Sequence, residues 1–270
     1  MKEWPGTGRI QLSISLLVIF GLPIGILGQQ PFLTDDTDVT EKGKFHLEII
    51  NEFDLLQRTS RPLRYQNATR ATIAYGVAEN VEVSVASVFL TVRSGEAPRT
   101  AAGVGDTTIA VKYNLLKEKE DSKLPAMTVS GYVQTPTGDS NRGLGSGVFD
   151  YGIIGIAQRT YRSKNVVRLN AGILFSGNTQ TGALGIVAVR GRVYTGGISY
   201  VRSVNDRLQL GAELTGAVTG RFELSRGQLQ PQFGGNYQIR KNTTVDFGLI
   251  VGRFAASPRA GLQIGFSHDF

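Results

Sequence analysis

The sequence predicts an all-β protein, a closed antiparallel transmembrane β-barrel of about twelve strands preceded by a cleaved signal peptide. Three features indicate this class: an apolar leader, long segments in which apolar and polar residues alternate, and a last segment that ends in an aromatic residue. We therefore divide the 270 residues into a signal peptide (1–28), an N-terminal periplasmic segment (29–43) and the barrel (44–270).

Residues 1–28 have the three parts of a secretory signal peptide. Lys2 and Arg9 form a basic start, residues 10–27 are largely apolar, and the small residue Gly28 precedes the expected cleavage point. The alternative is an N-terminal membrane anchor, since the apolar stretch is close to the length that spans a bilayer. Pro23 and the small final residue favour cleavage. No later stretch is as apolar, so we expect the mature chain to enter a membrane with strands.

The composition favours strands and turns over helices. The chain has 34 glycines, against about 19 for average usage at this length, and glycine is a poor helix former. The absence of cysteine excludes disulfides, thiolate metal sites and cysteine nucleophiles. The net charge of +7 comes from Lys and Arg spread along the chain. Nucleic-acid binding is therefore not expected, whereas contact with anionic outer-membrane lipid is.

Alternation with a period of two decides the class. In residues 229–239 (LQPQFGGNYQI) the odd positions are apolar or small, while the even positions are amides or glycine. Residues two apart in a strand share a face, so one face is apolar and the other polar. Residues 81–86, 208–215 and 245–252 show the same pattern. Such strands are typical of a barrel with lipid outside and water inside.

Twelve segments follow this pattern, each roughly 10 to 13 residues long, which is enough for a tilted strand to cross the hydrocarbon layer. Strands of soluble proteins average about 5 to 6 residues, which argues against a β-sandwich. No fixed internal period indicates a repeat array. In one segment the apolar face changes midway, which predicts a bulge at Gly196 and Gly197. The segments are 44–54, 65–75, 81–92, 105–116, 126–135, 148–159, 165–176, 190–202, 208–218, 227–239, 244–254 and 259–270.

The connections place both chain ends on one side. Outer-membrane barrels have short periplasmic turns and longer external loops, and tight turns here alternate with loops rich in Gly, Ser, Asn and Thr. Two connections break the alternation: residues 117–125 form a long charged turn, and residues 255–258 form a short loop.

The last residues, LQIGFSHDF (262–270), have apolar side chains at alternate positions and Phe270 at the end. This pattern resembles the C-terminal strand that the outer-membrane barrel assembly machinery recognises, so we expect that machinery as a partner. His268 departs from the pattern, because a hydrophobic or aromatic residue is usual there.

Two further segments resemble a known family. Residues 30–36 (QPFLTDD) precede Gly43 and the first strand, and residues 134–139 (QTPTGD) precede the glycine-rich run 143–147 (GLGSG) and Asp150. Both are similar to motifs of the meta-pathway phenol-degradation outer-membrane family, and the likeness covers essentially the whole mature chain. The resemblance implies a bacterial outer-membrane barrel that transports aromatic or other hydrophobic compounds.

From these observations we expect a channel or facilitator for the passive passage of small solutes, aromatic or hydrophobic ones among them. The alternative is a non-conducting structural or adhesive barrel whose external loops bind a partner. Either way, we expect the bacterial outer membrane as the location and no cofactor.

Ten charged side chains fall on the predicted lumen face. In the simpler interpretation they pair as solvated salt bridges that brace a narrow barrel. In the functional interpretation they line a constriction that selects solutes by charge. They are Glu48, Glu52, Arg70, Glu82, Lys112, Arg168, Arg190, Arg192, Glu213 and Asp246.

Asp35, Asp36 and Asp38 precede the first strand. Three close carboxylates are a candidate Ca²⁺ site, but the spacing lacks the Gly and the distal Glu of an EF-hand loop, so no metal site is predicted. We expect residues 29–42 to fold into the periplasmic mouth as a small plug, anchored by Pro31 and Phe32.

No catalytic or cofactor site is predicted. The run 143–147 lacks the GKS/T of a phosphate cradle and predicts a mobile external loop. The best catalytic candidates are His46 and the run Ser267, His268 and Asp269. A nucleophile must lie within hydrogen-bond reach of its base, and Ser267 and His268 face opposite sides of one strand. An enzyme is therefore not expected.

Overall fold

The computed structural model describes residues 31–97, 99–119, 123–176, 191–219 and 227–270. The predicted signal peptide (1–28) and the candidate Arg190 lie outside the described residues. Within the described ranges, no helix has the length and apolarity needed to cross a membrane. Two short 3₁₀ turns occur there, η1 (Arg58–Ser60) and η2 (Ser140–Arg142).

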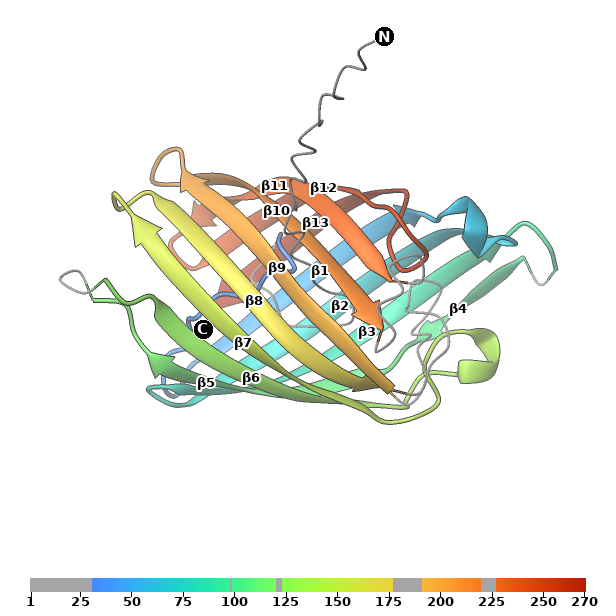
Figure 1. Ribbon diagram of the computed structural model, residues 1–270, viewed down its shortest axis with the longest axis horizontal. Helices are drawn as coiled ribbons and strands as arrows, with labels where there is room; N and C mark the ends of the chain where they lie inside the picture. Colours follow the sequence, from blue (N-terminus) through green and yellow to red (C-terminus); the bar gives the residue numbers. More distant parts are fainter. Residues whose placement is uncertain (1–30, 98, 120–122, 177–190, 220–226) are drawn as a thin grey trace, which may run out of the picture.

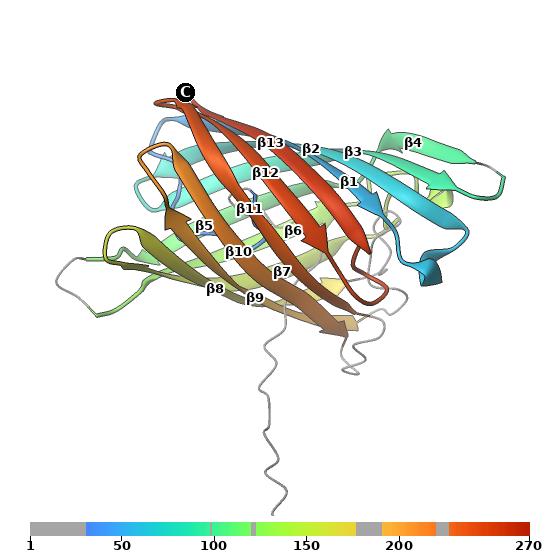
Figure 2. The ribbon, with the colours of Figure 1, turned by 90° about the horizontal axis from the view of Figure 1, so that it is seen from above.

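The described strands form one closed antiparallel barrel (Figures 1 and 2). Neighbouring wall strands in the sequence pair with one another, β3 pairs with β5, and β13 pairs with β1 to close the wall. The short β4 extends beyond the wall as a hairpin with β3 (Figure 2). The strands are β1 (Phe45–Leu55), β2 (Leu63–Ala78), β3 (Val81–Ser94), β4 (Thr100–Val104), β5 (Thr107–Leu116), β6 (Ala126–Thr135), β7 (Asp150–Tyr161), β8 (Asn165–Ser176), β9 (Gly191–Ser203), β10 (Leu208–Thr219), β11 (Gln228–Arg240), β12 (Thr243–Val251) and β13 (Ala260–Asp269).

The predicted fold class is confirmed, and the strands differ from the prediction in some details. The short β4 was not predicted, and β5 begins at Thr107, two residues later than the predicted segment 105–116. Gly105 and Asp106 lie between the two strands, and the Asp106 carboxylate accepts hydrogen bonds from loop amides. The predicted bulge at Gly196 and Gly197 is wrong, because β9 pairs with both β8 and β10 without a shift of register. Two adjacent glycines carry no side chains that would show which face is apolar, and this hid the regular alternation.

The two ends of the barrel differ. The turn end carries the short turns, such as residues 79–80 and 162–164, together with the C-terminal residue Phe270. The loop end carries the longer connections, including residues 136–149. Since barrels of this kind place short turns in the periplasm and long loops outside the cell, the turn end is the periplasmic end.

Burial is inverted relative to a soluble protein. Large apolar side chains on the outer face are exposed, for example Leu249 at 57% and Ile264 at 61%, whereas Thr215 and Gln232 on the inner face are at most 1% exposed. An apolar outer surface of this extent is stable against lipid and not against water. The pattern therefore places the wall in a membrane.

Aromatic rings mark both ends of the apolar band. Phe45 and Tyr75 lie together at the turn end with 4.7 Å between ring centroids, and Tyr151 and Phe175 stack at the loop end at 5.3 Å. Aromatic side chains gather at both membrane–water interfaces of outer-membrane barrels. The part of the wall between these two groups of aromatic rings is therefore the part embedded in the membrane.

Candidate solute pathway and the segment that crosses it

Residues 31–42, which we call the luminal segment, lie inside the barrel (Figure 1). Phe32, Thr34 and Thr37 are at most 2% exposed. The segment crosses the lumen from β2, beside its own exit into β1, to β11 on the opposite side. Inward-facing side chains of the wall contact the segment along its length.

The turn-end part of the segment is held by β2 and β3. Lys42 forms a parallel bridge with Gly76, and the Gly43 amide donates to the Gly76 carbonyl at 2.8 Å. A side chain at position 76 would collide with the backbone of Thr40 and Glu41, which explains the glycine. The backbone amide and hydroxyl of Thr40 both donate to one carboxylate oxygen of Glu82, at 2.8 and 2.7 Å.

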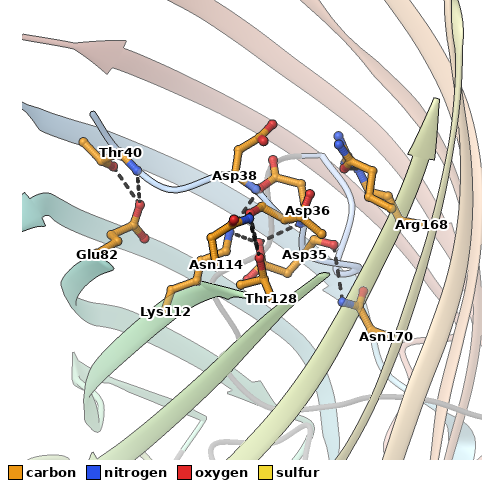
Figure 3. Close-up of polar contacts among 12 residues, drawn as sticks. Asp35, Asp36, Asp38, Thr40, Glu82, Lys112, Asn114, Thr128, Arg168 and Asn170 are labelled. Atoms are coloured by element: carbon orange, nitrogen blue, oxygen red, sulfur yellow. Dashed lines mark hydrogen bonds and ion pairs between the residues drawn. The ribbon is translucent and has the colours of Figure 1, made fainter. Parts of the chain in front are cut away.

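The middle of the segment is held by a buried ion-pair cluster (Figure 3). The Lys112 ammonium contacts Asp35 at 2.8 Å and Asp36 at 3.0 Å, and all three side chains are at most 9% exposed. Beside them, the Asn114 amide and the Thr128 hydroxyl donate to the Thr37 carbonyl at 2.8 and 2.7 Å. On the other side, the Asn170 amide donates to the Asp35 carbonyl.

The far part of the segment is seated on β9 to β11. The Glu213 carboxylate accepts the Leu33 amide at 2.8 Å, the Thr34 amide at 2.9 Å and the Thr34 hydroxyl at 3.0 Å. The Gln232 amide donates to the Pro31 carbonyl. At Gly197 a Cβ atom would lie 2.8 Å from the Thr34 methyl group, so the missing side chain makes room for the segment.

Burial and neighbouring charges shift the pKa values of the three segment carboxyls in different directions. Burial raises the pKa of Asp35 to about 7, helped by Asp36 and opposed by Lys112. Burial also acts to raise the pKa of Asp36, but Lys112 and Arg168 outweigh it and lower the value. For Asp38 burial prevails and the pKa is raised. One lysine thus serves two carboxyl groups, and Asp36 is the one that stays charged most readily.

The predicted lumen residues divide into three groups. Arg192 is exposed and shares the outer face of β9 with Ile198 and Tyr200, because the odd-numbered residues of β9 face inward. Placing it in the lumen was therefore wrong. Arg190 lies outside the described residues. The remaining eight face inward, and they are Glu48, Glu52, Arg70, Glu82, Lys112, Arg168, Glu213 and Asp246.

Two cavities lie on opposite sides of the luminal segment. The vestibule, about 730 Å³, opens at the turn end and is lined by Asp35, Glu82 and Lys112 among others. The outer chamber, about 140 Å³, lies on the loop-end side and has Leu33 in its wall. Residues 33–36 therefore lie between the two spaces, with Leu33 lining the outer chamber and Asp35 and Asp36 lining the vestibule. Across the part of the chain that the structure describes, no group of three or more His, Asp and Glu side chains is placed to hold a metal ion.

The loop 136–149 packs against the loop end of the barrel. Asp106 accepts hydrogen bonds from the Gly138 amide at 2.9 Å and the Ser146 amide at 2.6 Å, and Leu144 is only 1% exposed. The glycine-rich run predicted to be a mobile external loop is thus anchored by a buried carboxylate.

The sequence analysis missed the uncharged side chains that hold the luminal segment, such as Asn114, Thr128 and Gln232. The alternation of apolar and polar residues places each of them on the polar face of its strand, so the sequence predicts that they point inward. The alternation does not predict that they bind the backbone of the luminal segment, since that segment lies far away in the sequence.

Comparisons with solved structures identify the same architecture. An outer membrane channel from Pseudomonas putida F1 is 12% identical, with a TM-score of 0.69, over 87% of this chain and 98% of that one. The KdgM porin is 9% identical, with a TM-score of 0.54, over 83% and 99%, and the NanC porin is 10% identical, with a TM-score of 0.56, over 82% and 98%. At these identities the likeness concerns the fold. No curated protein matches the chain.

A family model described as "Putative MetA-pathway of phenol degradation" matches residues 30–270. The match includes the luminal segment as well as every strand of the barrel. The chain therefore belongs to this family, as a barrel of the bacterial outer membrane whose wall has twelve strands, β4 lying outside the wall.

Proposed function

We propose that the barrel is a channel for the passive passage of small solutes, aromatic or hydrophobic ones among them, across the outer membrane. The observation that carries the proposal is a closed wall with a polar inner face and two cavities separated by residues 33–36. A barrel of twelve strands is wider than an eight-stranded one, whose interior side chains fill, so its lumen has room for such a segment. Two of the similar solved structures are porins and a third is an outer membrane channel, which supports the same function.

In this proposal the luminal segment is a plug. Apart from its own continuation into β1, it is held by hydrogen bonds, ion pairs and the packing of Phe32 and Leu33 against the wall, and it pairs with the strands at one isolated bridge, so it can leave without breaking the barrel. The eight inward charges have two roles: some hold the plug, as Lys112 and Glu213 do, and the others line the remaining path.

Conductance in planar bilayers tests the proposal. We expect the chain to conduct and the variant lacking residues 31–42 to conduct more, because the lumen is then free. Reversing two inward charges, Lys112→Glu with Arg168→Glu, should change the preference for anions or cations. As a control, Arg192→Glu changes an outward charge and should leave the preference unchanged.

A wild type and a deletion variant that both form folded barrels but pass neither ions nor small solutes would refute the channel. That result would favour the alternative function, a structural or adhesive barrel. We further propose that the protein is not an enzyme. The His46 Nδ1 and Asp269 Oδ1 atoms form a hydrogen bond of 2.7 Å between β1 and β13, which fits a contact that joins the two strands at the turn end.

The C-terminal strand β13 is proposed to be the signal for the barrel assembly machinery. Its outward side chains Leu262, Ile264 and Phe266 are exposed on the lipid side, and the exposed terminal residue Phe270 follows the strand at the turn end. In the assembled barrel β13 is joined to β1, so this strand is also the one that closes the wall.

A further inference from the structure

A third cavity lies outside the lumen, at the loop end of the barrel. Its volume is about 390 Å³, and it is lined by Tyr65, by the hairpin residue Gly95 and by three arginines, Arg64, Arg93 and Arg99, among others. All three arginines are exposed. Two of them belong to the β3–β4 hairpin, which extends beyond the wall (Figure 2). A molecule outside the barrel can therefore reach the cavity without entering the solute pathway.

The three guanidinium groups have no anionic partner in the part of the chain that the structure describes. None of them forms an ion pair or a side-chain hydrogen bond there. Glu96, the carboxylate of the same hairpin turn, forms no ion pair within those residues either. Like charges around one space repel one another, so an anion that enters the cavity is stabilised.

The described connections of the loop end carry arginine and no lysine. Residues 56–64, 93–97, 99, 136–149 and 252–259 contain the carboxylates Glu96 and Asp139 and the cations Arg58, Arg61, Arg64, Arg93, Arg99, Arg142, Arg253 and Arg259. The turn end, in contrast, uses lysines such as Lys44, Lys164 and Lys241. The planar guanidinium binds two phosphate oxygens at once, whereas an ammonium acts as a point charge. The choice of arginine therefore points to phosphate rather than to anions in general.

The cavity lies at the level of the lipid headgroups. Tyr65, which lines it, stacks on Phe53 with 5.9 Å between ring centroids, and both rings are exposed on the lipid side. Arg93 is paired with Tyr65 across β2 and β3, and it shares the outward face of β3 with the exposed Phe89. Aromatic rings mark the membrane–water interface of such barrels, so the arginines lie where the apolar band ends.

Gly95 allows the Arg64 guanidinium to lie across the hairpin turn. A Cβ atom at position 95 would lie 2.7 Å from the Arg64 Nε atom and 2.9 Å from its Nη2 atom. The missing side chain thus brings an arginine of β2 to the arginines of the β3–β4 hairpin, and the three form one site.

We propose that this cavity binds the phosphate group of a lipid in the outer leaflet. The guanidinium groups of Arg64, Arg93 and Arg99 hold the phosphate oxygens, and the acyl chains lie along the outward faces of β1 to β3, where Phe53 and Phe89 are exposed. Free phosphate has the same charge chemistry, but only a lipid also covers the apolar surface beside the cavity. The site is on the outside of the wall, so it does not depend on whether the barrel conducts.

Native mass spectrometry of the full mature chain in detergent tests the site. The probes are dioleoyl phosphatidic acid, which ends in a phosphate monoester, and dioleoyl phosphatidylcholine, in which choline balances the phosphate charge. We expect phosphatidic acid to bind about tenfold more tightly, since a hydrogen bond between charged groups has at least this effect. Arg93→Gln with Arg99→Gln should remove the preference.

The matched control is Arg192→Gln with Arg202→Gln. It removes two exposed arginines from the outer face of β9, away from the cavity, and should leave the preference intact. Heat-modified migration in gel electrophoresis identifies any variant that does not fold.

Gly95→Ala tests the arrangement without changing the charge. The added Cβ atom displaces the flexible Arg64 side chain rather than any backbone, so the barrel should fold and bind phosphatidic acid several-fold more weakly. Unchanged binding would remove Arg64 from the site.

Inorganic phosphate as a competitor separates the two sources of the anion. At the same concentration it should not displace phosphatidic acid, because it has no acyl chains to contact the wall. Displacement would overturn the assignment to a lipid. Equal affinity of the wild type for the two lipids, or an equal loss of preference in the Arg192 and Arg202 control, would overturn the site itself.

Discussion

Lys112 contacts two buried carboxylates of the luminal segment, Asp35 and Asp36. Lys112→Met removes the cation that pairs with both, and breaking a buried pair in this way costs roughly 3–5 kcal/mol. We expect the segment to leave its seat, which limited proteolysis of residues 31–42 and a rise in conductance would both show. The triple variant Lys112→Met, Asp35→Asn, Asp36→Asn has no uncompensated charge and should dock again. A Lys112→Met protein that is as protease-resistant as wild type would contradict this role.

The raised pKa of Asp35 predicts that docking depends on pH. In the released segment Asp35 has its ordinary pKa of 3.8, whereas docking raises it to about 7. The docked state therefore holds a proton more tightly, and its advantage is complete below 3.8 and is lost as pH rises to about 7. The raised pKa of Asp38 acts in the same direction, and the lowered pKa of Asp36 acts in the opposite direction.

Between about pH 5 and pH 7, Asp36 is ionised in both states, so Asp35 and Asp38 are the carboxyls of the segment whose titration changes docking. We expect conductance to rise over this interval and Asp35→Asn to reduce the rise. The charged groups that face Asp35 are Lys112, Glu82 and Asp36, so the pH profile of Glu82→Gln serves as the control for a contribution from β3. A profile that falls with rising pH would contradict the assignment.

At the scale of elements, the interruption between β4 and β5 gives the wall an anchor for the loop 136–149. Asp106 accepts the Gly138 and Ser146 amides, and hydrogen bonds to a charged group contribute about 1.5–3 kcal/mol each. Asp106→Ala should therefore release the loop, and hydrogen exchange at both amides should speed up markedly.

Asp139→Ala is the matched control for this anchor. Asp139 lies in the same loop and is exposed, and its carboxylate accepts the Asn141 amide at the start of η2. Its replacement should affect exchange at Asn141 and leave Ser146 protected. Unchanged protection of Gly138 and Ser146 in Asp106→Ala would show that packing of Leu144 alone holds the loop.

At the scale of the whole molecule, we expect the final residue to affect assembly rather than function. Deleting Phe270 should lower the amount of folded barrel in the outer membrane several-fold, and Phe270→Tyr, which keeps an aromatic ring, should restore it. Heat-modified migration of membrane fractions in gel electrophoresis measures the folded amount. Normal assembly of the deletion variant would remove Phe270 from the signal.

The period-two pattern predicted the barrel because every wall strand has one face in lipid and one in the lumen, and this constraint is local. It failed for Arg192, where Gly196 and Gly197 carry no side chains to mark the faces. The period-two pattern could not predict the contacts of the luminal segment either, for another reason. Lys112 and Asp36 are 76 positions apart and meet only because the wall closes around the segment, and no local pattern encodes closure.

The seat of residues 31–42 is distributed over strands from β2 to β11, although these residues precede all of them in the chain. A sheet that lacks any of these strands does not offer the complete set of partners, so a segment that precedes the wall in the chain takes its place only after the wall strands have come together. Protection of these residues from protease thus distinguishes a barrel with all of these strands in place from an earlier, partial sheet.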